Sequence, residues 1–374
     1  MVVDHILTVP QGTFTLERAH HDPGEPLRAW DAADELALAH LAEVGAAGDR
    51  WLVVDDAHGA LATALAAHHP TSWTDSVVTM AATRANLERN GLEPSTVTLA
   101  PSTSDPVGPV DVVVVKVPRT LAVLEDELHR LRPLLHAGSV VVGAGMTKSV
   151  HRSTIAAFEG AIGPTPTSRA RKKARLLLAS VDPALEPGPG PAPLRWATPE
   201  GLEVTGLPGV FSASGMDPGT RLLLAHLPDP EPGAVAVDLG CGTGVVAATV
   251  AHSHPDVALV CCDDSFRAVA AARQTVGAVA SDATFHVTDV LDGVADASAD
   301  IVLCNPPFHA GGARTTSVAY RMFAGAQRVL RPGGTLTVVA NRHLGHHVAL
   351  RRWFDDVTVV GSDPRFVVLR GRRR

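Results

Sequence analysis

Two nine-residue segments constrain the fold most strongly, because nearly the same sequence recurs far along the chain. DVVVVKVPR (111–119) aligns without a gap to DIVLCNPPF (300–308), and each is an apolar run of strand length that meets a proline. Around both segments, short apolar runs alternate with helical patterns in the same order. Such alternation is typical of a doubly wound, mostly parallel sheet with helices on both faces. The sequence therefore predicts an internal duplication of one α/β unit.

The second copy shows the whole order of elements. A strand at 234–240 leads into a glycine turn, and further strands lie within ALVCCDD, TFHVTD, DIVLCNPP and TLTVVAN. The last two strands, VTVVGS and FVVLRG, have no helix between them, so we expect an antiparallel hairpin at one edge. We predict two tandem Rossmann-like, seven-stranded units at 1–181 and 197–374. A Pro/Gly-rich linker is predicted at 182–196.

Composition excludes several classes of protein. The formal net charge of −7 argues against a generally basic nucleic-acid binder. The N-terminus has no basic segment before an apolar core, and no run approaches the ~20 apolar residues of a membrane span. We therefore expect a cytoplasmic protein with no membrane or DNA partner. The sequence leaves the oligomeric state open and only slightly favours a monomer. The four cysteines lack Cys-x-x-Cys spacing, which favours reduced, buried thiols.

Charge is unevenly distributed along the second copy. Residues 197–300 carry 3 Arg against 14 Asp and Glu, whereas residues 301–374 carry 12 Arg against 3 Asp and end in RGRRR. A second basic cluster, SRARKKAR, occupies 168–175. A solvated surface is the ordinary interpretation of such arginines. An arginine-rich segment directly after the Asn-Pro-Pro-Phe turn, however, is expected to place cations beside that turn.

The copies differ where strands meet turns. The first turn is DLGCGTG in the second copy and DDAHGAL in the first, and the second strand ends in DDS or TDS. The predicted pairs, second copy first, are Gly240 and Ala57, Gly242 and Gly59, Gly244 and Leu61, Asn305 and Lys116, and Phe308 and Arg119. We interpret the second copy as carrying a site and the first as carrying only the scaffold.

The glycine turn of the second copy predicts a bound ligand. A strand that ends in Asp238 and continues as G-x-G-x-G into a helix lets the backbone approach a ligand closely. Dinucleotide sites usually show G-x-G-x-x-G, where a diphosphate sits at the helix N-terminus. Here the third glycine, Gly244, comes one residue earlier. This tighter spacing favours a ligand without a diphosphate.

Carboxylates at the ends of the next two strands identify that ligand. Asp263 and Asp264 follow at roughly the ~20-residue spacing at which a carboxylate binds a ribose diol. Asp289 is placed either to accept a hydrogen bond from an adenine amine or to cap a turn. Together these features predict S-adenosylmethionine as the cofactor. Its predicted ligands are Asp238, Gly240, Gly242, Gly244, Asp263 and Asp289.

The turn after the fourth strand suits an acceptor amine. A sulfonium methyl donor is already a strong electrophile, so an enzyme mainly has to align the acceptor with it. The Asn305 side-chain oxygen and the backbone carbonyl of Pro306 can accept both amine hydrogens and turn the nitrogen lone pair towards the methyl group. Prolines stiffen the turn, and Phe308 offers a face on which an extruded base stacks. The predicted catalytic residues are Asn305, Pro306, Pro307 and Phe308. Cys304 is expected to be a strand residue, because no covalent nucleophile is needed.

Several motifs resemble one known family. VDLGCGTG, CNPPFH and GVFSASGMDPGTRLLLAHLP (209–228) are similar to bacterial ribosomal-RNA guanine-N2 methyltransferases, which carry a degenerate methyltransferase fold in front of an active one. LRAWDAADE, KVPRTLAVLEDEL, VANRHLGHH and FVVLRG resemble the large-subunit branch (methyltransferase G) more than the small-subunit branch (methyltransferase C). The resemblance covers most of the chain. It implies two tandem class I methyltransferase folds, the N-terminal one degenerate and used to recognise RNA.

The resemblance also implies an activity and a site. The activity is methylation of the N2 amine of a guanosine in large-subunit (23S) rRNA, with small-subunit (16S) rRNA as the alternative substrate. It assigns the six cofactor residues above to S-adenosylmethionine and the segment 305–308 to the base. In other members the position of Asp289 can be Asn, which also accepts from adenine. The residues alone fit either guanine or adenine.

Two other classes stay open. A protein glutamine-amide methyltransferase also uses an Asn-Pro-Pro motif, but it usually carries Tyr where Phe308 stands and pairs with a small helical domain. A non-catalytic RNA-binding assembly factor would use both copies as scaffold. The intact glycines, acids and Asn305 argue against that second class.

Four further features have two interpretations each. His309 contacts the base or a phosphate, or caps the next helix. Phe211 and Asp217 either close over the cofactor or serve packing and helix capping. The first-copy residues Lys116, Arg119 and Lys148 contact RNA or are solvated loop ends. His343, His346 and His347 have i, i+3, i+4 spacing and are read as a polar helix face or phosphate contacts, so no metal is expected.

Overall fold

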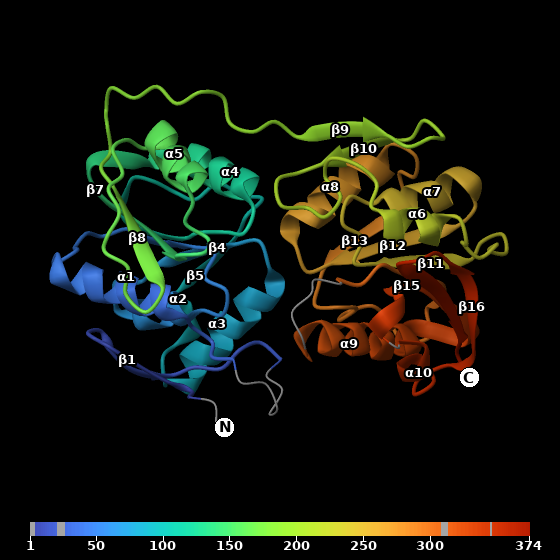
Figure 1. Ribbon diagram of the computed structural model, residues 1–374. Helices are drawn as coiled ribbons and strands as arrows, with labels where there is room; N and C mark the ends of the chain where they lie inside the picture. The colour runs from blue at the N-terminus through green and yellow to red at the C-terminus, as the bar shows by residue number, and fades with distance from the viewer. Residues whose placement is uncertain (1–3, 21–26, 308–312, 345) are drawn as a thin grey trace. The chain divides into compact units, whose positions relative to one another are not determined.

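The computed structural model describes residues 4–20, 27–307, 313–344 and 346–374. The chain forms two compact units, Met1–Ala192 and Pro193–Arg374, each with its own central sheet (Figure 1). Within the described ranges, no helix is long and apolar enough to cross a membrane.

The N-terminal unit is built around a sheet with the strand order β5-β4-β3-β6-β7-β8. Neighbouring strands are parallel except β7 and β8. The strands are β3 (Trp51–Val54), β4 (Thr71–Thr74), β5 (Thr98–Pro101), β6 (Val110–Lys116), β7 (Leu135–Met146) and β8 (Ala174–Ala179). The helices are α1 (Ala32–Glu43), α2 (Ala60–Ala64), α3 (Val77–Arg89), α4 (Leu121–Leu131) and α5 (Arg152–Ala161), with 3-10 turns at Ala66–His68, Pro94–Thr96 and Arg132–Leu134.

The C-terminal unit has the strand order β13-β12-β11-β14-β15-β17-β16, in which β17 runs in the direction opposite to the other six strands. The strands are β11 (Val235–Leu239), β12 (Ala258–Asp263), β13 (Thr284–Val287), β14 (Ala299–Cys304), β15 (Leu330–Asn341), β16 (Asp355–Ser362) and β17 (Phe366–Arg372). The helices are α6 (Pro218–Leu224), α7 (Val245–Ser253), α8 (Phe266–Gly277), α9 (Ala313–Val329) and α10 (His346–Leu350), with a 3-10 turn at Arg342–Leu344.

Apolar residues at successive positions of the central strands cover both sheet faces, since side chains alternate along a strand. In β6, Val112 and Val114 pack with α1 and α2, whereas Val113 and Val115 pack with α4 and α5. In β11, Ala236 faces α6, α7 and α8, whereas Val237 faces α9 and α10. The predicted doubly wound α/β architecture is confirmed in both units, and so is the edge hairpin of β16 and β17.

The N-terminal sheet departs from the prediction of seven strands, because six are formed among the described residues. Residues 163–173 lie where the missing strand is expected. There the carbonyls of Pro164 and Pro166 accept from Ser180 and Leu178, both at 2.9 Å, but a proline has no N–H to donate in return. Only the isolated bridges Thr167–Leu177 and Arg171–Ala174 form. The prolines therefore prevent a regular ladder at this edge.

The duplication extends to a two-stranded hairpin in front of each sheet. The hairpins are β1 (Ile6–Val9) with β2 (Gly12–Thr15), and β9 (Leu194–Ala197) with β10 (Glu203–Gly206). The residue Glu17, just past β2, donates its N–H to Asn86 Oδ1 on α3 at 2.9 Å. Correspondingly, Thr205 in β10 donates its N–H to Thr275 Oγ1 on α8 at 3.0 Å. A side-chain oxygen on the equivalent helix thus holds each hairpin.

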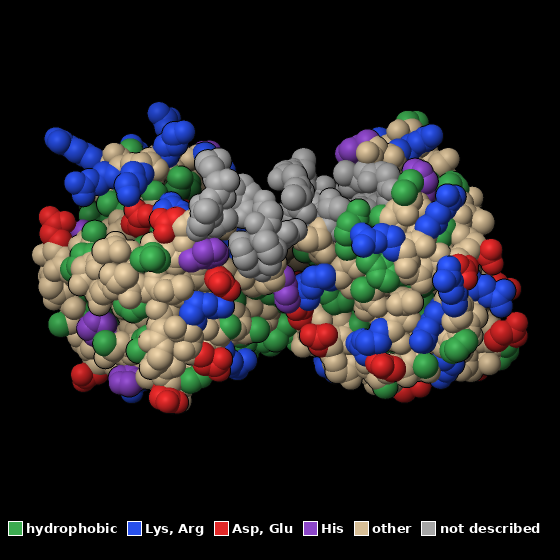
Figure 2. All heavy atoms as spheres, turned by 90° about the horizontal axis from the view of Figure 1, so that it is seen from below, with side chains coloured by type: hydrophobic (Ala, Val, Ile, Leu, Met, Phe, Trp, Pro, Cys, Tyr) green, Lys and Arg blue, Asp and Glu red, His purple; other side chains and the backbone are tan. Residues whose placement is uncertain are grey.

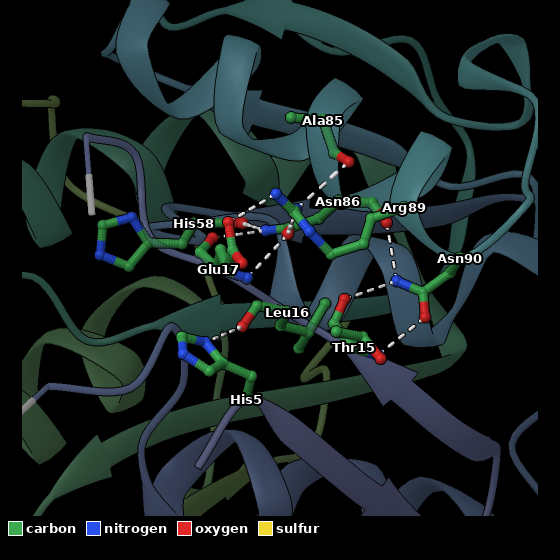
Figure 3. A network of polar contacts seen from close by, with 9 residues as sticks. All are labelled: His5, Thr15, Leu16, Glu17, His58, Ala85, Asn86, Arg89 and Asn90. Carbon is green, nitrogen blue, oxygen red and sulfur yellow. Dashed lines mark hydrogen bonds and ion pairs between the residues drawn. The ribbon is translucent and has the colours of Figure 1, made fainter. Parts of the chain in front are cut away.

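The buried Asn86 uses its whole amide in this contact (Figure 3). Its Oδ1 accepts from Glu17 N and from Arg89, and its Nδ2 donates to the carbonyls of Glu17 and His58. One turn later, Asn90 pairs with both backbone groups of Thr15 at 2.8 Å. The two amides therefore continue the hairpin's hydrogen bonding onto α3.

The structure shifts the predicted alignment of the first turns by two residues. Gly244 and Gly59 both have φ of 77° and both precede the first residue of their helix. Gly240 (φ 76°) and Asp55 (φ 57°) both donate their N–H to the end of the neighbouring strand. The corresponding residues, second unit first, are Gly240 and Asp55, Gly242 and Ala57, and Gly244 and Gly59. The predicted alignment, which matches Asp238 with Asp55, is wrong. Asp238 belongs to the strand β11, whereas Asp55 belongs to the turn that follows β3.

Candidate active site at the carboxyl edge of the C-terminal sheet

The described residues that the sequence singles out come together at one edge of the C-terminal sheet. Because β11 to β14 are parallel, their carboxyl ends lie side by side. Asp238 lies within β11, Asp263 ends β12, Asp289 follows β13 and Asn305 follows β14. The glycine turn 240–244 joins β11 to α7 at the same edge. This is the position at which open α/β sheets bind ligands.

The glycine turn combines a packing requirement with an open surface. A Cβ on Gly244 would lie 2.8 Å from Ala272 Cα, so glycine is needed for α7 to approach α8. At Gly242, by contrast, the nearest atom to an added Cβ would be the Phe211 carbonyl oxygen at 3.7 Å. All three glycines of the turn have positive φ. The backbone of Gly242 is therefore the part of the turn with room for a ligand.

Asp263 is fixed against that turn. Its Oδ2 accepts from Gly242 N and its Oδ1 from Ser265 N, both at 3.0 Å. The carboxylate is half-buried. The predicted ribose carboxylate and the predicted ligand-binding backbone are thus neighbours.

Asp238 lies behind the turn. Its side chain is 4% exposed, and its Oδ2 accepts from Ala247 N in the first part of α7 at 3.1 Å. Burial, reinforced by the charge of Asp263, raises the pKa of Asp238 to about 7. This carboxyl group therefore ties strand, turn and helix together from the protein interior.

Asp289 has a partner that the sequence did not indicate. Its Oδ2 lies 2.5 Å from a guanidinium nitrogen of Arg321 on α9, and the side chain is half-buried. The ion pair holds the carboxylate at the edge of the sheet. Arg321 was missed because nothing in the helical pattern of α9 distinguishes one arginine from another.

Asn305 presents an unused acceptor. Its Nδ2 donates to Thr220 Oγ1 at 2.9 Å, whereas its Oδ1 is buried and accepts no hydrogen bond from any described residue. A buried acceptor without a donor is costly, so it marks a place where a ligand donates. Thr220 is 4% exposed, and its N–H is capped by Asp217 at 3.1 Å. Pro306 is buried and Pro307 exposed, while Phe308 lies outside the described residues.

Sequence reasoning missed Thr220 because its role depends on a fold contact 85 residues away. The N-cap signal of Asp217 before Pro218 was readable, and the capping interpretation of Asp217 is confirmed. Phe211, the other residue of this segment, is 49% exposed, so packing does not explain it. Its carbonyl instead lies over the glycine turn.

The cysteines are inert thiols, as predicted. All four are free and buried, and Cys304 at the end of β14 is 1% exposed. Burial raises the pKa of Cys304 well above its usual value, which keeps the thiol protonated. His309 lies outside the described residues, and His343 and His347 are exposed. Among the described residues, no group of three or more His, Cys, Asp and Glu is arranged to hold a metal ion.

The arginine-rich segment after the Asn-Pro-Pro-Phe turn was expected to place cations beside that turn. Arg321 of this segment does lie at the same sheet edge, beside Asp289, but the last arginines of the chain do not. β17 is antiparallel, so Phe366 pairs with Asn341 at the carboxyl edge and Arg372 pairs with Thr335 at the opposite edge. Arg372, Arg373 and Arg374 therefore lie towards the edge opposite Asn305. Arg374 pairs with Asp355 at 2.7 Å, which makes the tail part of the sheet's other end.

The equivalent position in the N-terminal unit is closed by an internal ion cluster. Lys116, which corresponds to Asn305, lies 2.6 Å from Asp34 and 3.0 Å from Asp31. Asp34 and Thr220 are both the third residue after an N-cap aspartate, so they occupy the same place. Burial opposes the charge of Lys116, but the two carboxylates outweigh it and hold the pKa of this ammonium above its usual value. Lys116 is thus not a solvated loop end.

The strand order of the C-terminal sheet, with a glycine turn after the central strand β11, defines the class I methyltransferase fold. The solved structure of the T. thermophilus 16S rRNA N2 G1207 methyltransferase, in complex with AdoMet and guanosine, has the same two-unit fold. Its TM-score is 0.78 at 24% sequence identity, covering 99% of this chain and 97% of that chain. The chain is a class I methyltransferase in which the fold occurs twice.

Two family models together span most of the chain. One described as RLMG N-terminal domain matches residues 4–183, and one described as methyltransferase small domain matches residues 201–370. Ribosomal RNA large subunit methyltransferase G of Streptomyces coelicolor is 50% identical over 97% of this chain and 99% of its own length. The protein of that name from Pseudomonas paraeruginosa is 43% identical over 98% and 99%. The chain belongs to the ribosomal RNA large subunit methyltransferase G family.

Proposed function

We propose that the C-terminal unit transfers a methyl group from S-adenosylmethionine to the exocyclic N2 amine of one guanosine in large-subunit (23S) rRNA. The observation that carries this proposal is Asn305 Oδ1, a buried acceptor at the ligand-binding edge of the sheet to which no described residue donates a hydrogen bond. Family membership supports the rRNA substrate and the large subunit. The protein would act in the cytoplasm.

The residues at this edge fit S-adenosylmethionine. When bound, this cofactor supplies an electrophilic methyl group on a sulfonium. We assign its amino-acid end to the open backbone of the glycine turn at Gly242, and its ribose to the Asp263 carboxylate that this backbone binds. Asp289, held by Arg321, is assigned to the adenine amine. Asp238 supports the turn from behind, and Gly240 and Gly244 give it its shape.

Asn305 would hold the acceptor amine. Its Oδ1 and the carbonyl of Pro306 accept the two N–H groups of the base, which favours a pyramidal nitrogen whose lone pair points towards the methyl group. A lone pair that is no longer delocalised into the ring is a better nucleophile. Pro307 limits the freedom of the turn, and Phe308 is assigned to stacking on the base.

Thr220 is a positioning residue in this proposal. An asparagine amide can rotate so that its oxygen and nitrogen exchange places, and only one orientation offers an acceptor to the amine. Thr220 Oγ1 accepts from Nδ2 at 2.9 Å and so favours the orientation in which Oδ1 is available. Because Thr220 is buried and Asp217 caps its N–H, the hydroxyl has little freedom to move.

The decisive experiment is methyl transfer from labelled S-adenosylmethionine to separated large- and small-subunit rRNA from cells that lack this gene, followed by nucleoside mass spectrometry. We expect label as N2-methylguanosine in large-subunit RNA only. Label only in small-subunit RNA would contradict the assigned subunit. Absence of label from both RNAs, with S-adenosylmethionine still bound, would redirect the search to protein acceptors.

A further inference from the structure

A row of exposed cations lies at the carboxyl edge of the N-terminal sheet. Arg119 follows β6, Lys148 follows β7, and Arg171, Lys172 and Lys173 directly precede β8. Because β8 is antiparallel to β7 and pairs Ala174 with Met146, its start lies at the carboxyl end of β7. These five residues, named the cationic rim, therefore share one edge of one sheet.

The tip of the β8 hairpin is a turn that does not favour lysine. Arg171 and Ala174 exchange both backbone hydrogen bonds, at 2.9 and 2.8 Å, so Lys172 and Lys173 form a two-residue loop. Both lysines have positive φ, 48° and 64°. This is the type I′ geometry, for which Asn-Gly is strongly preferred because side chains with Cβ are strained there. Backbone strain of this kind often accompanies function. Compared with the preferred Asn-Gly pair, the two lysines add positive charge to the turn.

The hairpin tip is held in place by its neighbours. Thr147 N donates to the Lys173 carbonyl at 2.7 Å, and Lys172 Nζ lies 2.7 Å from Glu35 of α1. Among the described residues, Lys172 is the only member of the rim with a carboxylate within 4.0 Å. The other four members have no such carboxylate partner among the residues that the structure describes.

At the same edge, Lys116 does not offer its charge to a small anion, because Asp31 and Asp34 already neutralise that ammonium. Cations spread over three adjacent strands, ~4.8 Å apart, instead span about 10 Å. Such a row can contact several charges of a polyanion at once. Figure 2 shows Lys and Arg side chains gathered on part of the surface of the N-terminal unit.

We propose that the cationic rim binds the phosphodiester backbone of the rRNA substrate. The proposal rests on the proposed function, because it assigns the N-terminal unit to the same RNA. Phosphate contacts position a protein on nucleic acid without reading sequence. In this proposal the cationic rim increases the affinity for RNA by binding its phosphodiester backbone, whereas Asn305 selects the acceptor amine.

The hairpin permits a test that separates charge from folding. Replacing Lys172→Asn together with Lys173→Gly removes two cations and installs the residues that the I′ turn prefers, so the full-length variant should be at least as stable. The matched control, Arg84→Gln with Arg195→Gln, removes two exposed cations outside the rim. Binding to a large-subunit rRNA transcript is measured from about 50 mM to about 300 mM salt.

We expect the hairpin variant to bind the transcript roughly 10- to 30-fold more weakly at ~0.15 M salt, with a slope of log K against log salt shallower by about 1.8. The control should keep both affinity and slope. Arg119→Gln with Lys148→Gln should weaken binding in the same way.

Affinity and slope equal to the control in both rim variants, while the unmodified protein binds and methylates the transcript, would overturn the rim alone. Failure of the unmodified protein to bind the transcript would overturn the rim and the proposed function together. Normal RNA binding without methylation of any rRNA would overturn only the proposed activity. A loss of thermal stability in the Asn-Gly variant would show that the lysines serve the fold.

Discussion

Lys116 and Asn305 follow the same strand of the two duplicated sheets, yet their side chains do opposite things. The ammonium of Lys116 forms ion pairs with two carboxylates of its own unit, while the buried side-chain oxygen of Asn305 accepts no hydrogen bond from the part of the chain that the structure describes. The residue that contacts this side chain differs correspondingly: it is Asp34 for Lys116 and Thr220 for Asn305. A binding site in this fold can therefore be closed by two side-chain changes that neutralise each other, without disturbing the sheet.

The first turns show how little the scaffold depends on the site. Asp55 takes the left-handed conformation that Gly240 takes in the other unit, which aspartate tolerates better than most residues. Gly59 matches Gly244, and a Cβ on either would meet the Cα of the next helix at 2.6 or 2.8 Å. The glycine required for packing is present in both units. The glycine with room for a ligand, Gly242, is an alanine in the first.

The largest expected effect is on the stability of the N-terminal unit, at the ion cluster around Lys116. Lys116→Ala leaves the buried carboxylate of Asp34 without its counter-charge and should lower the free energy of unfolding of the N-terminal unit by roughly 3 to 5 kcal/mol. Denaturant titration of the full chain measures it. The double variant Lys116→Met with Asp34→Leu removes both charges and should recover most of the loss. A single variant as stable as the unmodified protein would contradict the role of the ion cluster.

The corresponding change in the open site should affect turnover instead. Asn305→Ala should reduce the rate of methyl transfer by roughly 10²- to 10³-fold, because it removes a fixed acceptor that aligns the amine. Cofactor affinity, measured by calorimetry, should stay within a factor of about two. Equal losses of rate and cofactor affinity would remove Asn305 from its assigned role.

Stability should also depend on pH in a predictable direction. The folded protein holds protons on Asp56 and Asp238, whose pKa values are raised to about 6 and about 7 by burial, while the unfolded chain releases them near pH 4. The free energy of unfolding should therefore fall as pH rises from about 4 and level off above about 7, by roughly 2 to 4 kcal/mol for Asp238. Asp238→Asn keeps an acceptor for Ala247 and should flatten this slope; an unchanged slope would refute the raised pKa.

Asp263 and Thr74 end corresponding strands and allow a matched comparison. Asp263→Ala should weaken S-adenosylmethionine binding roughly 10- to 100-fold, since both a ribose contact and the support of Gly242 N are lost. Thr74→Ala in the N-terminal unit should leave cofactor binding unchanged. Calorimetric titration distinguishes them, and unchanged affinity in the Asp263 variant would refute the ribose assignment.

The smallest effect is expected at Thr220. Thr220→Val keeps the shape but removes the hydroxyl that orients Asn305, and should lower turnover about tenfold without changing cofactor affinity. Thr220→Ser retains the hydroxyl and should restore the rate. If Val and Ser variants behave alike, the residue is purely structural.

Much of this site could be predicted from the sequence because the relevant residues terminate strands. Apolar runs of strand length mark β11, β12 and β14, and parallel strands necessarily bring Asp238, Asp263 and Asn305 to one edge. The duplication was readable for the same reason. The alignment of the first turns was wrong because it matched two aspartates by identity. The two residues differ in backbone conformation, which the sequence does not display.

The ion-pair partners of charged side chains could not be predicted from the sequence. Nothing along the chain says that Lys116 meets Asp31, 85 residues earlier, or that Arg321 meets Asp289. The C-terminal arginines were misplaced because the direction of the last strand decides which edge they reach.

By itself, then, the sequence determined the order of strands and helices, the glycine turn and the Asn-Pro-Pro segment, because hydrophobic periodicity and backbone restrictions act locally. Tertiary structure alone decided which carboxylate each cation meets, which side of the Asn305 amide is free, and which edge carries the cationic rim. Those outcomes depend on contacts between distant residues, whose geometry exists only once the sheets have formed.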